Sequence, residues 1–347
     1  MAVTKFYTDN ALTRKRYADD LFRIILPNIE YPELVGTGSD AGVQMRKDLL
    51  TKGSGDKITF GIRRPLTGEG IVGDATWEGN EEKLSFKDFN MTIEELGHAV
   101  QAGGEMEAQR VPWNLLDEGK TALRDWWAQK LSDHMFAHIC GDTTFKVAGK
   151  TFAQDPTNPD TGHLLVVNNK TEATVTSADG IDRTFLDAAR QRAESPDPSL
   201  NQDIVRPFLV NGKPHYRVIL HDYCFDQLRQ NFNAGEFGDL ARAAQKLGIP
   251  SVEIVYNGMM ISKSRRIRKV ADNIYRNVLF GPQAMTLAWG GAGKSTGTNL
   301  SFVVKQRDYD RTTMIAAGGI FGFKKVVFDG KDYGVLTLTG YGAALSA

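Results

Sequence analysis

The chain has 347 residues, with 42 lysine and arginine residues against 42 aspartate and glutamate residues, so its formal net charge at pH 7 is zero. A dedicated nucleic-acid-binding protein would carry a basic excess, so this balance argues against that class, and a near-neutral surface favours association between copies. Two cysteines are too few for a disulfide framework, and we find no signal peptide and no apolar run of membrane-spanning length, so we expect folding in a reducing compartment.

Residues 1–52 are interpreted as an N-terminal arm. The apolar spacing over 11–25 predicts a short amphipathic helix, which Pro27 ends. The segment 31–39 has no pattern that could form a core of its own. An arm of this composition needs a surface to lie on, from its own body or from a neighbouring chain.

A long antiparallel ribbon is predicted over residues 53–98. Its two arms span Lys57–Leu66 and Lys83–Ile93, and the first arm has apolar residues at a period of two. The residues between the arms are rich in glycine and acid, with Trp77 at the predicted tip. Because an isolated two-stranded ribbon is marginally stable in water, this one should rest on another surface, which the next copy of the same chain can supply.

The strongest helix signal follows a short polar connector, which we place at 99–108. Apolar residues recur mainly three or four apart from Trp113 to Cys140, with Pro112 before the start and Gly141 at the end. At 1.5 Å per residue this helix would be about 40 Å long. A long ribbon that leads into a long rod indicates an extended body rather than a compact pocket.

The remaining sequence predicts a mixed α+β body. A long connection over 142–176 carries a strand-like segment at 163–167, and a helix begins at Asp179 or Asp182. After a proline-rich break at 195–199, Asn-Gly and Asp-Gly pairs predict hairpins. The hairpins pair 207–210 with 216–220, 252–256 with 259–262 and 324–328 with 335–339; the helices are 222–232 and 236–247, and further strands are 285–289, 301–305 and 313–317.

Two patterns could carry chemistry, and each has a plainer explanation. The stretch 288–295, which includes Lys294, fits a relaxed phosphate-binding loop, but the residues after it run into a strand rather than a helix, so a surface loop is favoured. His134 and His138 stand four residues apart on the long helix, which is a metal-binding spacing, yet no third ligand is evident. We expect two histidines on the helix surface, with a role in proton sensing as the weaker alternative.

Other candidate groups also lack catalytic partners. The adjacent acids at 81–82 and 94–95 have no neighbour in sequence that would separate their pKa values for acid–base work. Cys140 and Cys224 lack an activating base and are expected to be buried. The basic run Lys263–Lys269 is interpreted as a solvated loop or a contact with a neighbouring subunit, ahead of a contact with nucleic acid.

Four segments and the order of the elements resemble a known family. The segments are GSDAGVQMRKDLLTKGSGDKITFGIRRPLTGEGIVGD (38–74), EGNEEKLSF (78–86), HAVQAGGEMEAQRVPWNL (98–115) and NVLFGPQAMTLAWG (277–290). In these segments the chain resembles the N4-gp56 family of tailed-bacteriophage major capsid proteins. The order of arm, ribbon, long helix and α+β domain resembles the HK97-type capsid fold.

The resemblance implies an α+β chain with a definite division into domains. The implied parts are an N-terminal arm (1–52), an extended β-hairpin or E-loop (53–98), a peripheral domain (99–200 and 301–325) with a spine helix at 113–140, and an axial domain (201–300 and 326–347). Such a subunit is structural, has no enzymatic activity and needs no cofactor. It would assemble into hexamers and pentamers of an icosahedral phage head that encloses double-stranded DNA.

The resemblance also implies partners and a location. The partners are further copies of the chain, a separate scaffolding protein during assembly, a portal protein, a decoration protein in some heads, and packaged DNA through non-specific contacts, with no membrane. The protein would reside in the virion shell after assembly in the cytoplasm of the host bacterium. Because the tip over 67–82 contains no lysine, we expect no covalent Lys–Asn cross-link there.

Contacts between subunits are expected from the acidic and aromatic ribbon and from two basic groups. The candidates are Arg63, Arg64, Glu69, Asp74, Trp77, Glu78, Glu81, Glu82, Arg265, Arg266 and Arg268. Two other interpretations stay open at this point. One is a subunit of an encapsulin-like compartment, which shares the fold but encloses enzyme cargo, and the other is a P-loop NTPase.

Overall fold

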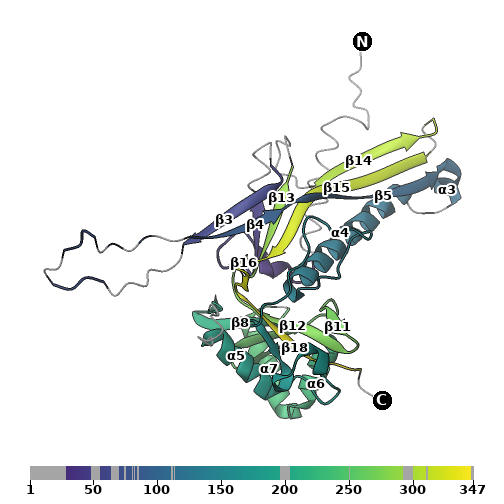
Figure 1. Ribbon diagram of the computed structural model, residues 1–347. Helices are drawn as coiled ribbons and strands as arrows, with labels where there is room; N and C mark the ends of the chain where they lie inside the picture. Colours follow the sequence, from purple (N-terminus) through teal and green to yellow (C-terminus); the bar gives the residue numbers. More distant parts are fainter. Residues whose placement is uncertain are drawn as a thin grey trace.

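Two β-sheets and one long helix organise the chain in the computed structural model (Figure 1). The structure describes residues 29–47, 55–63, 70–73, 76–79, 81, 83, 86–110, 112, 114–195, 204–249, 251–291, 300–309 and 312–344. The helix expected at 11–25 lies outside these residues. The long helix runs along a six-stranded sheet, an eight-stranded sheet and its helices form a second lobe, and the ribbon projects away from both (Figure 1).

Strand β15 (Thr312–Lys325) is the centre of the six-stranded sheet. It pairs antiparallel with β5 along one edge, and with β14 and then β13 along the other edge. Strand β2 joins β13 in parallel, and β1 joins β2 in the same way. The bounds are β1 (Val35–Gly36), β2 (Val43–Lys47), β5 (Glu94–Gly104), β13 (Met285–Gly290) and β14 (Leu300–Arg307).

The polar connector expected at 99–108 is wrong. Strand β5 continues to Gly104, and the short helix α3 (Glu105–Arg110) follows it. This stretch is rich in small and polar residues, so its own preference for a strand is weak. The strand is stabilised by backbone hydrogen bonds to β15, which lies far along the chain, so the local sequence could not predict it.

Helix α4 (Leu115–Cys140) confirms the predicted long helix. The Asn114 side chain caps its start by accepting a hydrogen bond from the Leu116 amide, and Gly141 ends it with a positive φ of 67°. The predicted apolar stripe is buried, with Leu123, Trp127 and Leu131 fully covered. The stripe packs on β15 and β5, so the rod and the six-stranded sheet form one layered body.

The ribbon is confirmed as an antiparallel pair of β3 (Lys57–Arg63) and β4 (Phe86–Thr92). Its register pairs Lys57 with Thr92 and Arg63 with Phe86. Residues 64–66 and 84–85 of the predicted arms lie outside the described residues, and Lys83 is not part of a strand. Beyond the paired part, the described residues 70–73 and 76–79 form no strand.

The eight-stranded sheet has the strand order β6-β18-β12-β8-β10-β9, with β11 beside β12 and β7 beside β8. The two Asn-Gly turns are confirmed, because Asn211 and Asn257 both have positive φ and connect β7 to β8 and β9 to β10. The bounds are β6 (Leu164–Val166), β7 (Phe208–Val210), β8 (Lys213–Leu220), β9 (Ile254–Tyr256), β10 (Met259–Lys263), β11 (Lys269–Ala271), β12 (Ile274–Phe280) and β18 (Val335–Tyr341); the helices are α5 (Arg183–Glu194), α6 (Asp222–Gln230) and α7 (Ala234–Leu247), and 3-10 turns occupy Pro32–Leu34, Val167–Asn169 and Glu172–Thr174.

The last predicted hairpin is wrong in its pairing. Asp329-Gly330 does form a turn, but it joins β16 (Val327–Phe328) to β17 (Lys331–Asp332). Strand β18 instead crosses to the eight-stranded sheet, between β12 and β6. The chain therefore passes from one sheet to the other within a few residues of this turn.

Sheet membership also departs from the expected domain boundaries. Strand β6 belongs to the eight-stranded sheet although it lies within 99–200, and β13 belongs to the six-stranded sheet although it lies within 201–300. Strand β12, which was not predicted, lies between β8 and β18 and pairs antiparallel with both. The assignment of the two lobes to a peripheral and an axial domain stays a prediction.

Candidate functional site

The root of the ribbon is held on the body by a small apolar cluster. Ile58, Phe89 and Met91 of the ribbon are buried against Val326 and Phe328, which lie at the crossover between the sheets. The ring of Phe89 lies 6.0 Å from that of Phe328 in an edge-on arrangement. Burial of these side chains fixes the direction in which the ribbon leaves the body.

A lysine from the sheet reinforces this root. The Lys324 ammonium lies 4.8 Å from the centre of the Phe89 ring and donates a hydrogen bond to the Asn90 carbonyl. Burial, together with the nearby charge of Lys57, lowers the pKa of Lys324. The ammonium therefore exchanges part of its hydration for a ring face and a carbonyl of the ribbon.

Two glycines allow the ribbon to cross the sheet at close range. A Cβ atom at Gly322 would lie 2.2 Å from the Thr92 carbonyl oxygen, and one at Gly290 would lie 2.4 Å from the Ile93 side chain. Both glycines sit inside strands, where a glycine often marks the close approach of another backbone. The chain passes over the sheet here because these positions carry no side chain.

The long loop that follows α4 closes over the same crossing. The Thr92 hydroxyl donates a hydrogen bond of 2.7 Å to the Ala153 carbonyl, and the Ala153 amide donates one of 2.6 Å to the Glu94 carboxylate. The Gln154 amide group donates 2.8 Å to the Phe323 carbonyl. The root is thus bonded to both the sheet and this loop, and sequence reasoning assigned no function to any of these residues.

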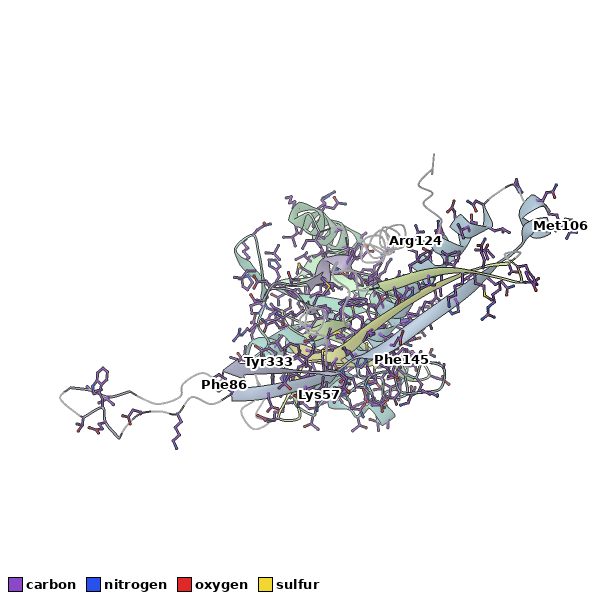
Figure 2. The ribbon with its side chains drawn as sticks, turned by 90° about the horizontal axis from the view of Figure 1, so that it is seen from above. Lys57, Phe86, Met106, Arg124, Phe145 and Tyr333 are labelled. Carbon is purple, nitrogen blue, oxygen red and sulfur yellow. The ribbon has the colours of Figure 1, made fainter. Side chains whose placement is uncertain are left out.

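The outer ribbon carries large apolar side chains that are exposed to solvent. Val72, Trp77 and Phe86 are 89%, 73% and 65% exposed, and Glu78 and Glu81 are exposed as well. Figure 2 shows the ribbon extending far from the remaining side chains. Large apolar side chains exposed along a projecting element indicate a surface for another molecule.

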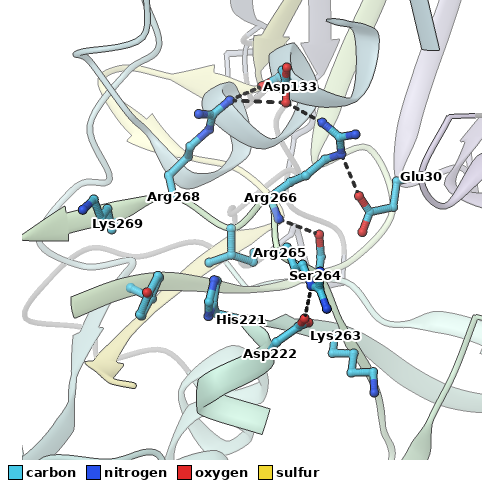
Figure 3. A pocket seen from close by; sticks show the side chains of 12 residues that line it. Glu30, Asp133, His221, Asp222, Lys263, Ser264, Arg265, Arg266, Arg268 and Lys269 are labelled. Carbon is cyan, nitrogen blue, oxygen red and sulfur yellow. Dashed lines mark hydrogen bonds and ion pairs between the residues drawn. The ribbon is translucent and has the colours of Figure 1, made fainter. Parts of the chain in front are cut away.

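The predicted contact residues fall into two groups. On the ribbon, the structure describes Trp77, Glu78 and Glu81. Arg63 is the last residue of β3, and only its backbone is described. The remaining ribbon candidates, Arg64, Glu69, Asp74 and Glu82, lie outside the described residues. The three arginines of the basic run lie at the junction of the two lobes, around an open cavity of about 960 Å³ (Figure 3).

Two of these arginines bind within their own subunit. Arg266 lies 3.0 Å from the Glu30 carboxylate and 2.6 Å from the Asp133 carboxylate, and Arg268 donates to the Asp133 carbonyl. These bonds join the N-terminal segment, helix α4 and the 263–269 loop (Figure 3). The solvated-loop interpretation is therefore wrong for Arg266 and Arg268, whose acidic partners are distant in sequence.

Arg265 faces outward instead. Its side chain is 90% exposed, while its Nε atom lies 2.8 Å from the Asp222 carboxylate, and that hydrogen bond raises the pKa of the arginine. Exposed pairs of this kind contribute little to stability. Arg265 is the most exposed arginine of these three.

The histidine pair is buried, which corrects the expectation of a surface position. His134 and His138 are 1% and 2% exposed, and the His134 ring is surrounded by Phe145, Phe152 and Phe321. Burial is the main cause that lowers the pKa of each to about 3. Both rings are therefore neutral core residues, and the described residues contain no group of three side chains suited to a metal ion.

The other chemical candidates are also accounted for. Cys140 and Cys224 are buried as expected, and burial raises the pKa of their thiols to about 11 and about 12. The glycine-rich stretch 288–295 begins inside strand β13, which ends at Gly290, and residues 292–299, including Lys294, lie outside the described residues. Within the described residues, no helix is both long and apolar enough to cross a membrane.

Solved structures identify the fold. The capsid of Ralstonia phage GP4 matches with a TM-score of 0.82 and 22% identity, over 100% of this chain and 97% of that chain. The Cyanophage Pam1 capsid asymmetric unit matches with a TM-score of 0.67 and 16% identity, over 99% and 97% of the two chains. The chain therefore has the HK97-type capsid fold.

Sequence comparison then gives the family. Residues 7–344 match the family described as phage capsid protein. The major capsid protein of Pseudomonas phage KPP25 is 24% identical, in an alignment that covers 88% of this chain and 88% of that protein. Because the family match spans most of the chain, the protein belongs to the phage capsid protein family, and it is a structural subunit of a phage capsid.

Proposed function

We propose that copies of this chain assemble into hexamers and pentamers of an icosahedral phage head through the projecting ribbon. The observation that carries the proposal is the ribbon itself, which is anchored at its root but leaves Trp77, Val72 and Phe86 exposed. The subunit cannot bury this apolar surface within its own body. If a neighbouring copy covers this surface, its burial stabilises the assembly by a hydrophobic free energy that is absent in the isolated subunit.

The ribbon corresponds in this proposal to the E-loop, and helix α4 to the spine helix. The lobe with the six-stranded sheet is the peripheral domain, and the lobe with the eight-stranded sheet is the axial domain. Strand β13 is reassigned to the peripheral domain and β6 to the axial domain, because each follows its sheet. We also assign the chain to the N4-gp56 group within the capsid family, on the sequence segments quoted above.

Contacts between subunits are proposed for the outer ribbon and for the basic surface. The ribbon side supplies Arg63, Arg64, Glu69, Asp74, Trp77, Glu78, Glu81 and Glu82. Arg265 supplies the exposed positive charge, while Arg266 and Arg268 act indirectly by holding the loop that presents it. Charge complementarity of this kind sets register and specificity between subunits.

The head would also bind other components. A separate scaffolding protein would guide assembly in the cytoplasm of the host bacterium, a portal protein would occupy one vertex, and a decoration protein could add to the outer surface. Double-stranded DNA would be enclosed without sequence-specific contacts, which suits a chain of zero formal net charge. The mature protein would then be part of the virion.

Deletion of residues 67–82 tests the role of the ribbon. The root contacts lie outside this segment, so the shortened subunit should fold, with a circular dichroism spectrum and urea midpoint close to those of the full chain. Electron microscopy should show no shells from it. A matched control replaces Arg242, an exposed residue of α7, with alanine and should leave shells intact. Normal shells from the deletion variant would refute the proposal.

We further propose that the protein has no catalytic activity. Lys294→Ala should change neither assembly nor any background hydrolysis of ATP, measured by phosphate release from purified subunits and shells. A hydrolysis rate that disappears with this substitution would contradict the proposal and favour the NTPase interpretation. Shells that enclose enzyme cargo and no DNA would favour the compartment interpretation instead.

A further inference from the structure

The open cavity beside the basic loop has the chemistry of a binding site for an acidic, aromatic segment. It lies where helix α4, the N-terminal segment and the 263–269 loop meet (Figure 3). Five cationic and three anionic side chains line it, so the lining carries a surplus of two positive charges, 5 − 3 = 2, with His221 counted as neutral. Its volume of about 960 Å³ is enough for several side chains.

The cationic side chains that line the cavity form two groups, one partly buried and one exposed. Arg266 and Arg268 are 29% and 27% exposed and bind the acids of the cavity wall. Lys263, Arg265 and Lys269 are 44%, 90% and 64% exposed, and each pairs with an acid of its own lobe; the Lys263 ammonium also lies 5.6 Å from the centre of the Phe225 ring. Such exposed pairs contribute little to stability, so carboxylates from another chain can replace them at little cost.

Aromatic rings form one side of the same cavity. The rings of His221 and Tyr275 are stacked with their centres 3.8 Å apart, and both line the cavity. Tyr223 stands beside them, 5.0 Å from the His221 ring, and is 38% exposed. His221 and Tyr275 are each only 8% exposed, so an aromatic side chain that entered here would contact the edge of this stack and the more exposed Tyr223 ring, in an edge-on arrangement.

The chain itself carries the complementary segment. Trp77, Glu78 and Glu81 of the outer ribbon are all exposed, so one large ring and two carboxylates lie within five positions. In its own subunit this segment lies far from the cavity, at the end of the projecting ribbon (Figure 1). We infer that the cavity of one subunit receives the Trp77–Glu81 end of the ribbon from a second copy, an inference that rests on the proposed assembly through the ribbon.

The same observations disfavour a nucleic-acid phosphate backbone as the occupant. Binding to DNA relies on a continuous basic surface, whereas Glu30, Asp133 and Asp222 line this cavity. Two of these acids pair with Arg266, so the most exposed positive charges, which are held in surface pairs, lie on the outer rim. Two separated carboxylates fit such a rim better than a regular chain of phosphates.

Disulfide trapping tests the contact directly. A double variant with Glu78→Cys and Arg265→Cys should form a ladder of cross-linked oligomers on a non-reducing gel when assembled, and none as isolated subunits. The native Cys140 and Cys224 are fully buried and should not interfere. The control pairs Glu78→Cys with Arg242→Cys, because Arg242 is exposed in the same lobe but does not line the cavity, and it should give no ladder.

A charge exchange gives an independent measurement. Replacing Arg265 and Lys269 with glutamate should raise the protein concentration needed for assembly by about tenfold or more, a change equivalent to at least about 1.4 kcal/mol. Adding Glu78→Lys and Glu81→Lys in the same chain should recover most of the assembly. Arg242→Glu should have no effect, since it changes charge elsewhere on the same lobe.

The outcomes separate this inference from the proposal on which it rests. If the unmodified protein forms no shells, the proposed function itself fails. If shells form but neither the ladder nor the exchange appears, only the receiving cavity is wrong. If the Arg265 and Lys269 variant forms normal shells that retain less DNA, the cavity binds nucleic acid and the inference is overturned.

Discussion

The substitution Gly322→Ala tests whether the ribbon root depends on close contact with the sheet. The added Cβ atom would lie 2.2 Å from the Thr92 carbonyl oxygen, whereas real Cβ atoms essentially never approach closer than 3.0 Å. Because the obstructing atom belongs to the backbone, the crossing strand must move by at least the difference, 3.0 − 2.2 = 0.8 Å. The cluster around Phe89 and Phe328 would then lose part of its packing.

The magnitude follows from two opposing effects. Forced overpacking of a tight contact costs about 1–3 kcal/mol. Replacing glycine with alanine also restricts the unfolded chain, which offsets about 0.4–1 kcal/mol. We therefore expect a net loss of about 1–2 kcal/mol in the free energy of unfolding, and a larger loss in assembly, because a displaced root points the ribbon away from its neighbour.

The assay compares this variant with Gly318→Ala in the same strand. A Cβ atom at Gly318 would meet Ser301 at 3.4 Å, an ordinary contact, so this control should be neutral or slightly stabilising. Urea unfolding of the isolated subunits, followed by circular dichroism, gives the difference in stability. Equal unfolding midpoints for the two variants, with equal yields of shells, would refute the anchoring role of Gly322.

Two further predictions concern buried charge. Burial lowers the pKa values of His134 and His138 to about 3 in the folded subunit, so the unfolded chain binds more protons than the folded chain between about pH 3 and pH 6.5. The free energy of unfolding should therefore keep its full value above about pH 6.5 and decrease as the pH falls towards 3. The free energy of unfolding, measured by urea titration at several pH values in this range, should depend less steeply on pH for His138→Leu than for the unmodified protein. An equal dependence on pH in the two proteins would contradict the assignment of His138 as a neutral buried ring. Asp332→Ala should cost about 3–5 kcal/mol, because it leaves Lys325 buried without its partner at 2.7 Å, and Lys325→Met combined with Asp332→Leu should recover most of that loss.

Elements with strong local signals were predicted well from the sequence. Helix α4 has an apolar stripe, an Asn114 cap and a terminal Gly141, all of which depend on neighbouring residues. The Asn-Gly turns were equally clear, because asparagine and glycine tolerate the positive φ that a tight hairpin needs. The alternation in the first ribbon strand likewise predicted its pairing.

Elements that depend on distant partners were missed. Six of the seven residues of β12 are buried, so its sequence has no alternation to distinguish a strand from a buried helix. Strand β5 has weak strand preference of its own and exists through its pairing with β15. His134 was assigned to the surface because the three phenylalanines around it come from segments well beyond its own helix turn.

The contacts between subunits stay a prediction. The sequence pointed to the ribbon as the element that needs a partner, and the exposure of Trp77 agrees with that reasoning. It could not show that Arg266 and Arg268 are engaged, because Glu30 and Asp133 are more than a hundred residues away along the chain. The glycines inside strands at 290 and 322 were the available signal for the anchored root, since a strand interior rarely favours glycine.

Electron microscopy of the purified protein, produced with and without the scaffolding protein that we propose as its partner, tests the central claim most directly. We predict closed shells of uniform size, in which each projecting ribbon lies on a neighbouring subunit and Trp77 is covered. Shells in which the ribbon contacts only its own subunit, or a preparation that contains no shells at all, would contradict the account.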